Sequence, residues 1–199
     1  MMTLVLGGAR SGKSRYAQSL CNSSRQVLYI ATAHSDGELN DSEMRERIAR
    51  HRADRPTNWQ TLEEPLDLAH AVRLVSIETT LLIDCATIWI SNLMWKFKEE
   101  PTIEQQRLIL AEVDNLIDAL ARRCSNSGAV GEVVIVSNEV GSGLVPENPV
   151  ARAFRDLQGF ANQRLAQAAD RVILVIAGLT LQLKPVNQNL NIQVKEAPK

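Results

Sequence analysis

Residues 7–14 have the types and spacing of a loop that binds phosphate groups. They read GGARSGKS and fit the pattern G-x-x-x-x-G-K-[ST], between a strand-like run and a segment that can begin a helix. Glycines permit a tight turn whose backbone N–H groups point at phosphate oxygens, and the following helix offers its positive end. A glycine-rich turn that contains Lys-Ser by chance is the alternative, which the neighbouring strand and helix disfavour.

The loop therefore predicts a site for a nucleoside triphosphate. Lys13 can contact the β- and γ-phosphates, and the Ser14 hydroxyl can ligate Mg²⁺. Kinases, ATPases and GTPases all use such loops, so the pattern does not identify the reaction. The residues that it assigns to the nucleotide are Gly7, Gly8, Ala9, Arg10, Ser11, Gly12, Lys13 and Ser14.

A carboxylate at the end of a neighbouring strand is expected to complete the Mg²⁺ site. Asp84 ends the apolar run at 80–84, and Glu139 follows the run at 133–137 by two residues. Either carboxylate could instead cap a helix or lie on the surface. We favour Asp84, because a carboxylate that ends a buried strand lies at the ligand-binding edge of an open α/β sheet.

A segment rich in arginine, residues 43–55, reads EMRERIARHRADR. Its glutamates precede arginines by four positions, which is typical of a solvated helix face. That interpretation leaves His51, Arg52 and Arg55 without local partners. Guanidinium groups bind phosphate in bidentate fashion, and neighbouring positive charge keeps an imidazole neutral and able to attack phosphorus. The sequence leaves both interpretations open.

The rest of the chain supplies the elements that must position these groups. Between short apolar runs, apolar residues recur every three or four positions over 109–120 and 150–165, which predicts helices. His70 lies in another helical stretch and is expected to be structural or solvated. Strands and helices alternate, so we expect an α/β fold with one mainly parallel sheet and helices on both faces. The predicted strands are Thr3–Leu6, Val27–Ala31, Thr80–Asp84, Val133–Ser137 and Val172–Ile176.

The length of 199 residues suggests one domain over residues 1–184. Residues 33–65 are polar and are expected to form an insert that carries His51 on a helix from about Asp41. Residues 185–199 have little to bury and are expected to form a flexible tail.

Composition excludes several other classes of protein. With 22 basic and 23 acidic residues, the net charge of −1 gives no general attraction to nucleic acid or to an anionic membrane. The longest apolar runs have the length of strands and fall short of the ~20 residues of a membrane span. Cys21, Cys85 and Cys124 are far apart and form no C-x-x-C pair. Three reduced thiols and no leader segment favour a cytoplasmic location.

Segments in a fixed order across the chain resemble one family. These are GGARSGKS (7–14), VLYIATA (27–33), D-x-E-M-x-x-R-I (41–48), H-R-x-x-R-P-x-x-W-x-T-x-E (51–63), LLIDCATIWISNL (81–93) and VSNEVGSGLVPENPVARAFRDLQGFANQRLA (136–166). The family that they resemble is the bifunctional adenosylcobinamide kinase/adenosylcobinamide-phosphate guanylyltransferase of cobalamin biosynthesis.

The resemblance implies two reactions, a RecA-like P-loop fold and a homotrimer. In the first reaction, ATP or GTP phosphorylates the aminopropanol arm of adenosylcobinamide. In the second, GTP guanylylates His51, and GMP then passes to adenosylcobinamide phosphate to give adenosylcobinamide-GDP. Besides the loop at 7–14, the nucleotide contacts that the resemblance implies are Ala31, Thr32, Ala33, Arg52, Ala53, Asp54, Arg55, Glu63 and Asp84.

Two other functions remain compatible with the phosphate-binding loop. One is a P-loop kinase for another small metabolite, in which His51 only contacts phosphate and transferase activity is absent. The other is a module that senses GTP without turnover. The segment at 51–63 favours the bifunctional enzyme over both, whereas nothing in the sequence identifies the corrinoid-binding residues.

Overall fold

The computed structural model describes residues 1–21, 26–33, 56–124, 131–185 and 195–196. The predicted helix that carries His51 lies outside these residues. The strands are β1 (Met2–Gly7), β2 (Val27–Ala31), β3 (Gln60–Glu63), β4 (Thr80–Asp84), β5 (Val133–Asn138), β6 (Arg171–Ile176), β7 (Leu179–Lys184) and β8 (Lys195–Glu196). The helices are α1 (Lys13–Leu20), α3 (Leu68–Leu74), α4 (Ala86–Lys96), α5 (Thr102–Cys124) and α6 (Pro149–Ala168).

The described strands form an eight-stranded sheet in the order β3-β2-β4-β5-β1-β6-β7-β8. Neighbouring strands from β3 to β6 in that order run parallel, whereas β7 pairs antiparallel with β6 and β8 pairs antiparallel with β7. This arrangement confirms the predicted α/β fold, since β1, β2, β4, β5 and β6 match the expected strands. Parallel pairing places the carboxyl ends of six strands along one edge, where ligands bind in open α/β sheets.

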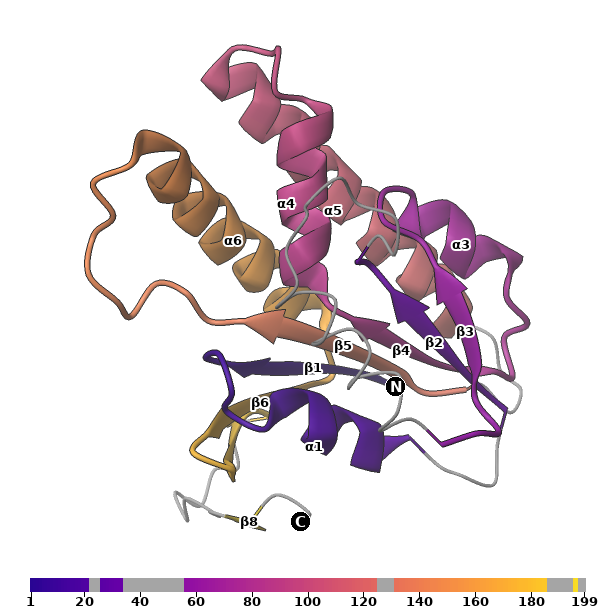
Figure 1. Ribbon diagram of the computed structural model, residues 1–199. Helices are drawn as coiled ribbons and strands as arrows, with labels where there is room; N and C mark the ends of the chain where they lie inside the picture. Colours follow the sequence, from indigo (N-terminus) through magenta and orange to yellow (C-terminus); the bar gives the residue numbers. More distant parts are fainter. Residues whose placement is uncertain (22–25, 34–55, 125–130, 186–194, 197–199) are drawn as a thin grey trace.

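Helices cover both faces of the sheet, as expected. Figure 1 shows α1 on one face and α3, α4, α5 and α6 on the other. Alternate strand residues point to opposite faces, so each face has its own core. Val5, Leu82 and Val134 are buried on the face covered by α1. Leu4 and Ile83, one residue along, are buried beneath the other helices.

Three strands were not predicted from the sequence. β3 is exposed at all four positions and has no apolar run, because it lies at the edge of the sheet. β7 follows β6 through a two-residue turn in which Ala177 and Gly178 have φ values of 51° and 80°. β8 pairs two residues of the predicted tail with β7, and most of that tail lies outside the described residues.

Side-chain hydrogen bonds stabilise the start of α6 and the end of α5. Asn148 precedes α6, and its side chain accepts hydrogen bonds from the N–H groups of Val150 (2.8 Å) and Ala151 (3.3 Å). At the end of α5, the buried Arg123 guanidinium donates to the backbone carbonyls of Val75 and Thr79. Among the described helices, none combines the length and apolar character that crossing a membrane would require.

Candidate functional site

Strand register brings the predicted site residues to the carboxyl edge of the sheet. Ala31 at the end of β2 pairs with Glu63 of β3 on one side and Asp84 of β4 on the other. On β1, Gly7 pairs with Asn138 of β5. Residues far apart in the sequence thus meet at one edge, between the phosphate-binding loop and the edge strand β3.

The loop between β1 and α1 has the backbone conformation that the glycine pattern predicts. Arg10 and Gly12 have positive φ values of 57° and 94°, and Gly12 is the capping residue just before α1. Lys13 is only 6% exposed, and its Nζ donates to the Gly8 carbonyl at 3.2 Å. The ammonium group is therefore held over the loop, where a phosphate group would meet it.

The turn between β6 and β7 contacts the phosphate-binding loop and stabilises it. The N–H of Gly178 donates to the Ser11 carbonyl at 2.9 Å. The hydroxyl of Ser11 is buried and has no hydrogen-bond partner among the described residues. A buried hydroxyl without a partner costs roughly 1–3 kcal/mol, and a phosphate oxygen in the loop is a group that would satisfy it.

Asp84 is half-buried at the end of β4 and points to the same face as α1. Its Oδ2 accepts a hydrogen bond from the Tyr29 hydroxyl at 2.9 Å. The next peptide, Asp84–Cys85, is cis, and the Thr32 hydroxyl joins the two strand ends at this point. That hydroxyl donates to the Cys85 carbonyl (2.8 Å) and accepts from the Cys85 N–H (3.0 Å).

Glu139, the other carboxylate considered for Mg²⁺, shapes the turn after β5. Its Oε1 accepts from the N–H of Gly141 at 2.8 Å, and its own N–H donates to the Gly7 carbonyl at 3.1 Å. Asp84 remains the carboxylate that we expect to ligate Mg²⁺. Together with Ser14 it offers hard oxygen donors, which suit Mg²⁺. Among the described residues, no group of three or more His, Cys, Asp or Glu side chains is placed so that it could hold a metal ion.

Asn138 lies at the same edge, paired with Gly7, and the sequence did not single it out. Its N–H donates to the Thr87 hydroxyl at 2.7 Å, and its carbonyl accepts from Asn162 Nδ2 at 2.9 Å. Beneath it, Ser137 and Gln158 complete a buried hydrogen-bonded group with Asn162. Two helices, α4 and α6, therefore fix the end of β5 beside the phosphate-binding loop.

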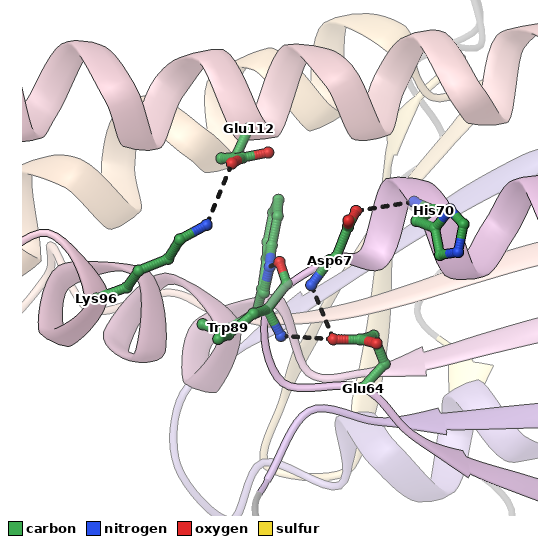
Figure 2. Close-up of polar contacts among 7 residues, drawn as sticks. Glu64, Asp67, His70, Trp89, Lys96 and Glu112 are labelled. Atoms are coloured by element: carbon green, nitrogen blue, oxygen red, sulfur yellow. Dashed lines mark hydrogen bonds and ion pairs between the residues drawn. The ribbon is translucent and has the colours of Figure 1, made fainter.

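Hydrogen bonds from its own side chains and from α4 hold the segment after β3, part of which Figure 2 shows. The Glu64 carboxylate accepts from the N–H groups of Leu66 (2.9 Å) and Asp67 (2.8 Å). The Trp89 indole donates to the Leu66 carbonyl at 2.9 Å, and Asp67 accepts from the N–H of His70 at 3.0 Å. His70 itself is exposed on α3, as expected for a solvated side chain.

The thiol next to Asp84 is protonated at neutral pH. Burial raises the pKa of Cys85 to about 11, and the negative charge of Asp84 adds to the rise. Only thiolates act as nucleophiles or metal ligands. Cys85 therefore contributes packing and backbone contacts at this edge.

Comparison with known proteins identifies the family of this chain. The family described as cobinamide kinase / cobinamide phosphate guanyltransferase (CobU) matches residues 3–183. The chain belongs to this family.

Curated members of the CobU family cover almost the whole chain. The bifunctional adenosylcobalamin biosynthesis protein CobU of Salmonella typhimurium is 43% identical over 188 residues, which span 92% of this chain and 100% of that protein. The Escherichia coli protein of the same name is 42% identical, with the same coverage. The bifunctional adenosylcobalamin biosynthesis protein CobP of Pseudomonas aeruginosa is 42% identical over 92% of this chain and 98% of its own length.

Solved structures resemble the chain in fold alone. A prototypical ATPase from the type III secretion system of pathogenic bacteria aligns over 87% of this chain and 50% of its own, with a TM-score of 0.52 and 14% identity. A Pyrococcus horikoshii OT3 protein from Project ID PH0250 aligns over 98% of this chain and 91% of its own, with a TM-score of 0.52 and 9% identity. These two matches show that the CobU-family chain shares its α/β fold with both proteins.

The structure brings together some of the sequence-predicted residues and leaves others undescribed. The loop at 7–14, the end of β2 (Ala31, Thr32, Ala33), Glu63 and Asp84 all lie at the carboxyl edge of the sheet. The rest of the predicted set lies outside the described residues, namely His51, Arg52, Ala53, Asp54 and Arg55.

Proposed function

We propose that the chain is a bifunctional enzyme of cobalamin biosynthesis that phosphorylates adenosylcobinamide and then transfers GMP from GTP to the product. The observation that carries this proposal is a P-loop beside Asp84 in a chain matched by the CobU family over residues 3–183. The curated relatives, at 42–43% identity, are named as bifunctional adenosylcobalamin biosynthesis proteins.

In the first reaction, ATP or GTP donates its γ-phosphoryl group. The hydroxyl of the aminopropanol arm attacks the γ-phosphorus and loses its proton to water, the bond between that phosphorus and the bridging oxygen breaks, and ADP or GDP leaves. Lys13 and the N–H groups of the loop at 7–14 stabilise the charge on the phosphate oxygens. Ser14 and Asp84 would hold Mg²⁺, which when bound neutralises part of that charge.

In the second reaction, His51 acts as a nucleophile. A neutral ring nitrogen attacks the α-phosphorus of GTP, and pyrophosphate leaves. A phosphate oxygen of adenosylcobinamide phosphate then attacks the same phosphorus, and the bond to the imidazole breaks. Two displacements replace one difficult one, because imidazole is both a good nucleophile and a good leaving group. Arg52 and Arg55 would neutralise the triphosphate, and Glu63, Ala53, Asp54 and residues 31–33 would line the nucleoside side.

A labelling experiment tests the covalent step. The chain is incubated with Mg²⁺ and GTP labelled at the α-phosphate, without a corrinoid, and is then denatured. We expect label on the protein that is stable to alkali and labile to acid, as a phosphoramidate is. His51→Ala should take no label, whereas it should still transfer the γ-phosphate of GTP to adenosylcobinamide.

His70→Ala is the matched control, because His70 is an exposed histidine on α3 outside the proposed site. This variant should be labelled like the wild type. Wild-type protein that takes no label would contradict transfer through a histidine, and a labelled His51→Ala would contradict the choice of residue. Lys13→Ala should lose both activities if one loop serves both reactions.

The same proposal includes a homotrimer in the cytoplasm. Free buried thiols at Cys21 and Cys85 are typical of a reducing compartment. Light scattering should give three times the chain mass of 22.0 kDa. A monomer with both activities at high dilution would contradict a trimer.

A further inference from the structure

A buried tyrosine holds one oxygen of the proposed metal ligand. The Tyr29 hydroxyl donates to Asp84 Oδ2 at 2.9 Å. Tyr29 is only 2% exposed, and its ring packs among Val5, Leu82 and Val134 beneath α1. A buried phenol needs a hydrogen-bond partner for its hydroxyl. Because the ring is held by its packing, the hydroxyl meets one carboxylate oxygen of Asp84, Oδ2.

Sheet register makes this contact a stable part of the fold. Ala31 pairs with Asp84 across β2 and β4, and Tyr29 lies two residues before Ala31 on the same face. Both strands are parallel and central, with neighbours on both sides. The pairing of β2 with β4 therefore keeps the Tyr29 hydroxyl beside Asp84.

The other oxygen of the carboxylate is available to a ligand. Among the described residues, none donates a hydrogen bond to Asp84 Oδ1. The carboxylate is half-buried at the carboxyl edge, on the face where α1 begins with Lys13 and Ser14. Asp84 thus has one oxygen engaged within the protein and one directed to binding.

A carboxylate with only one oxygen available for coordination favours Mg²⁺ over Ca²⁺. Mg²⁺ requires near-octahedral geometry at about 2.0–2.1 Å and takes carboxylates through one oxygen, with water and phosphate completing its shell. Ca²⁺ takes about 6–8 oxygens and accepts a carboxylate through both. Two-oxygen coordination by Asp84 would require Oδ2 to give up its bond from Tyr29.

We infer that Tyr29 is a positioning residue that sets the metal preference of the site, by reserving Asp84 Oδ2 and leaving a single oxygen for the cation. This inference rests on the proposed function, in which Asp84 holds Mg²⁺. In this inference Tyr29 acts on the metal through the Asp84 carboxylate, to which its hydroxyl donates.

The test compares the binding of two metal–nucleotide complexes. The dissociation constant of a non-hydrolysable GTP analogue is measured by calorimetry with saturating Mg²⁺ and again with saturating Ca²⁺. The ratio of the calcium value to the magnesium value is the readout. In Tyr29→Phe we expect the ratio to fall by about ten-fold, the scale seen when a ligand loses an outer hydrogen-bonding partner. A loss of stability alone would change both constants alike and leave the ratio unchanged.

Tyr16→Phe is the matched control. Tyr16 is the other tyrosine of the chain, it packs against the same apolar cluster from α1, and its hydroxyl has no partner among the described residues. The ratio of the calcium to the magnesium dissociation constant in Tyr16→Phe should equal that of the wild type. An unchanged ratio in Tyr29→Phe overturns the inference.

Asp84→Asn separates this inference from the proposed function. If Asp84→Asn weakens binding of the magnesium complex and Tyr29→Phe leaves the ratio unchanged, only the role of Tyr29 is wrong. If Asp84→Asn leaves binding of both complexes unchanged, Asp84 is not the ligand, and the proposed metal site is overturned together with the inference.

Discussion

At the residue scale, the end of β1 has no room for a side chain. A Cβ atom built on Gly7 would lie 2.5 Å from Ser11 Oγ and 2.6 Å from the Val175 carbonyl oxygen. The second neighbour is backbone of the adjacent strand β6 and cannot move cheaply. We expect Gly7→Ala to lower the free energy of unfolding by about 1–3 kcal/mol, as overpacking does, measured by urea denaturation.

Gly8→Ala is the control for this substitution, because a Cβ on Gly8 meets nothing within 4 Å. The two variants add the same methyl group to adjacent loop residues. Equal losses of stability would show that the close approach at Gly7 is not what requires glycine there. Loss only in Gly7→Ala would support the packing of the loop against β6.

The sequence predicted site residues whose chemistry is encoded locally. The loop at 7–14 is a contiguous pattern, and Asp84 ends an apolar run, so both could be identified without knowing the fold. Tyr29 could not, because its partner Asp84 is 55 residues away and only strand register brings the two together. Asn138 was missed for the same reason, since Thr87 and Asn162 hold it from two separate helices.

At the scale of elements, buried parallel strands were predictable and edge strands were not. The central strands are apolar nearly throughout because helices cover both faces, and this composition is visible in the sequence. β3 reads QTLE and gives no such signal. β7 reads LTLQLK, whose alternation after Ala177-Gly178 is typical of a hairpin strand and could have been recognised.

The start of α6 depends on one capping side chain. Asn148 Oδ1 accepts hydrogen bonds from two N–H groups of the first turn, which have no partner within the helix. Pro149 follows at the first helical position, where its missing N–H is not needed. We expect Asn148→Ala to lower the free energy of unfolding by about 1 kcal/mol, measured by urea denaturation.

Asn148→Asp should retain most of that stability, because a carboxylate also accepts from these N–H groups and interacts favourably with the helix dipole. Glu147→Ala, at the exposed residue just before the cap, controls for a change of surface charge. A loss in Glu147→Ala as large as in Asn148→Ala would argue that the loop before α6, rather than the cap, sets the stability of this end.

At the scale of the whole molecule, the parallel sheet is what assembles the site. The phosphate-binding loop, Asp84 and Asn138 come from three strands that are adjacent in the sheet but distant in sequence. Each strand end is held by a separate group: Gly178 braces the loop, Tyr29 contacts Asp84, and helices α4 and α6 hold β5. The contacts that hold these strand ends therefore both stabilise the sheet and fix the positions of the candidate site residues.

Truncations on the β7–β8 side of the sheet can show which residues belong to the cooperative folding unit. β8 contributes two residue pairs to β7, whereas β7 pairs with β6 over most of its length and covers the edge of the buried strands. We expect a chain that ends at Pro185 to unfold cooperatively, with a free energy of unfolding lower by no more than about 1–2 kcal/mol. It should bind GTP like the full chain, because the P-loop and Asp84 are unchanged.

A chain that ends at Ile176 is the matched comparison, since it removes β7 as well and exposes the pairing edge of β6, where Val172 and Ile173 are buried. That chain should lose cooperative urea unfolding, because β6 becomes an unpaired edge strand and its buried residues lose the cover of β7. The steepness of the urea transition measures the surface exposed on unfolding, so it distinguishes the two truncations directly. A chain ending at Pro185 with a markedly shallower transition would mean that residues beyond the predicted domain belong to its core.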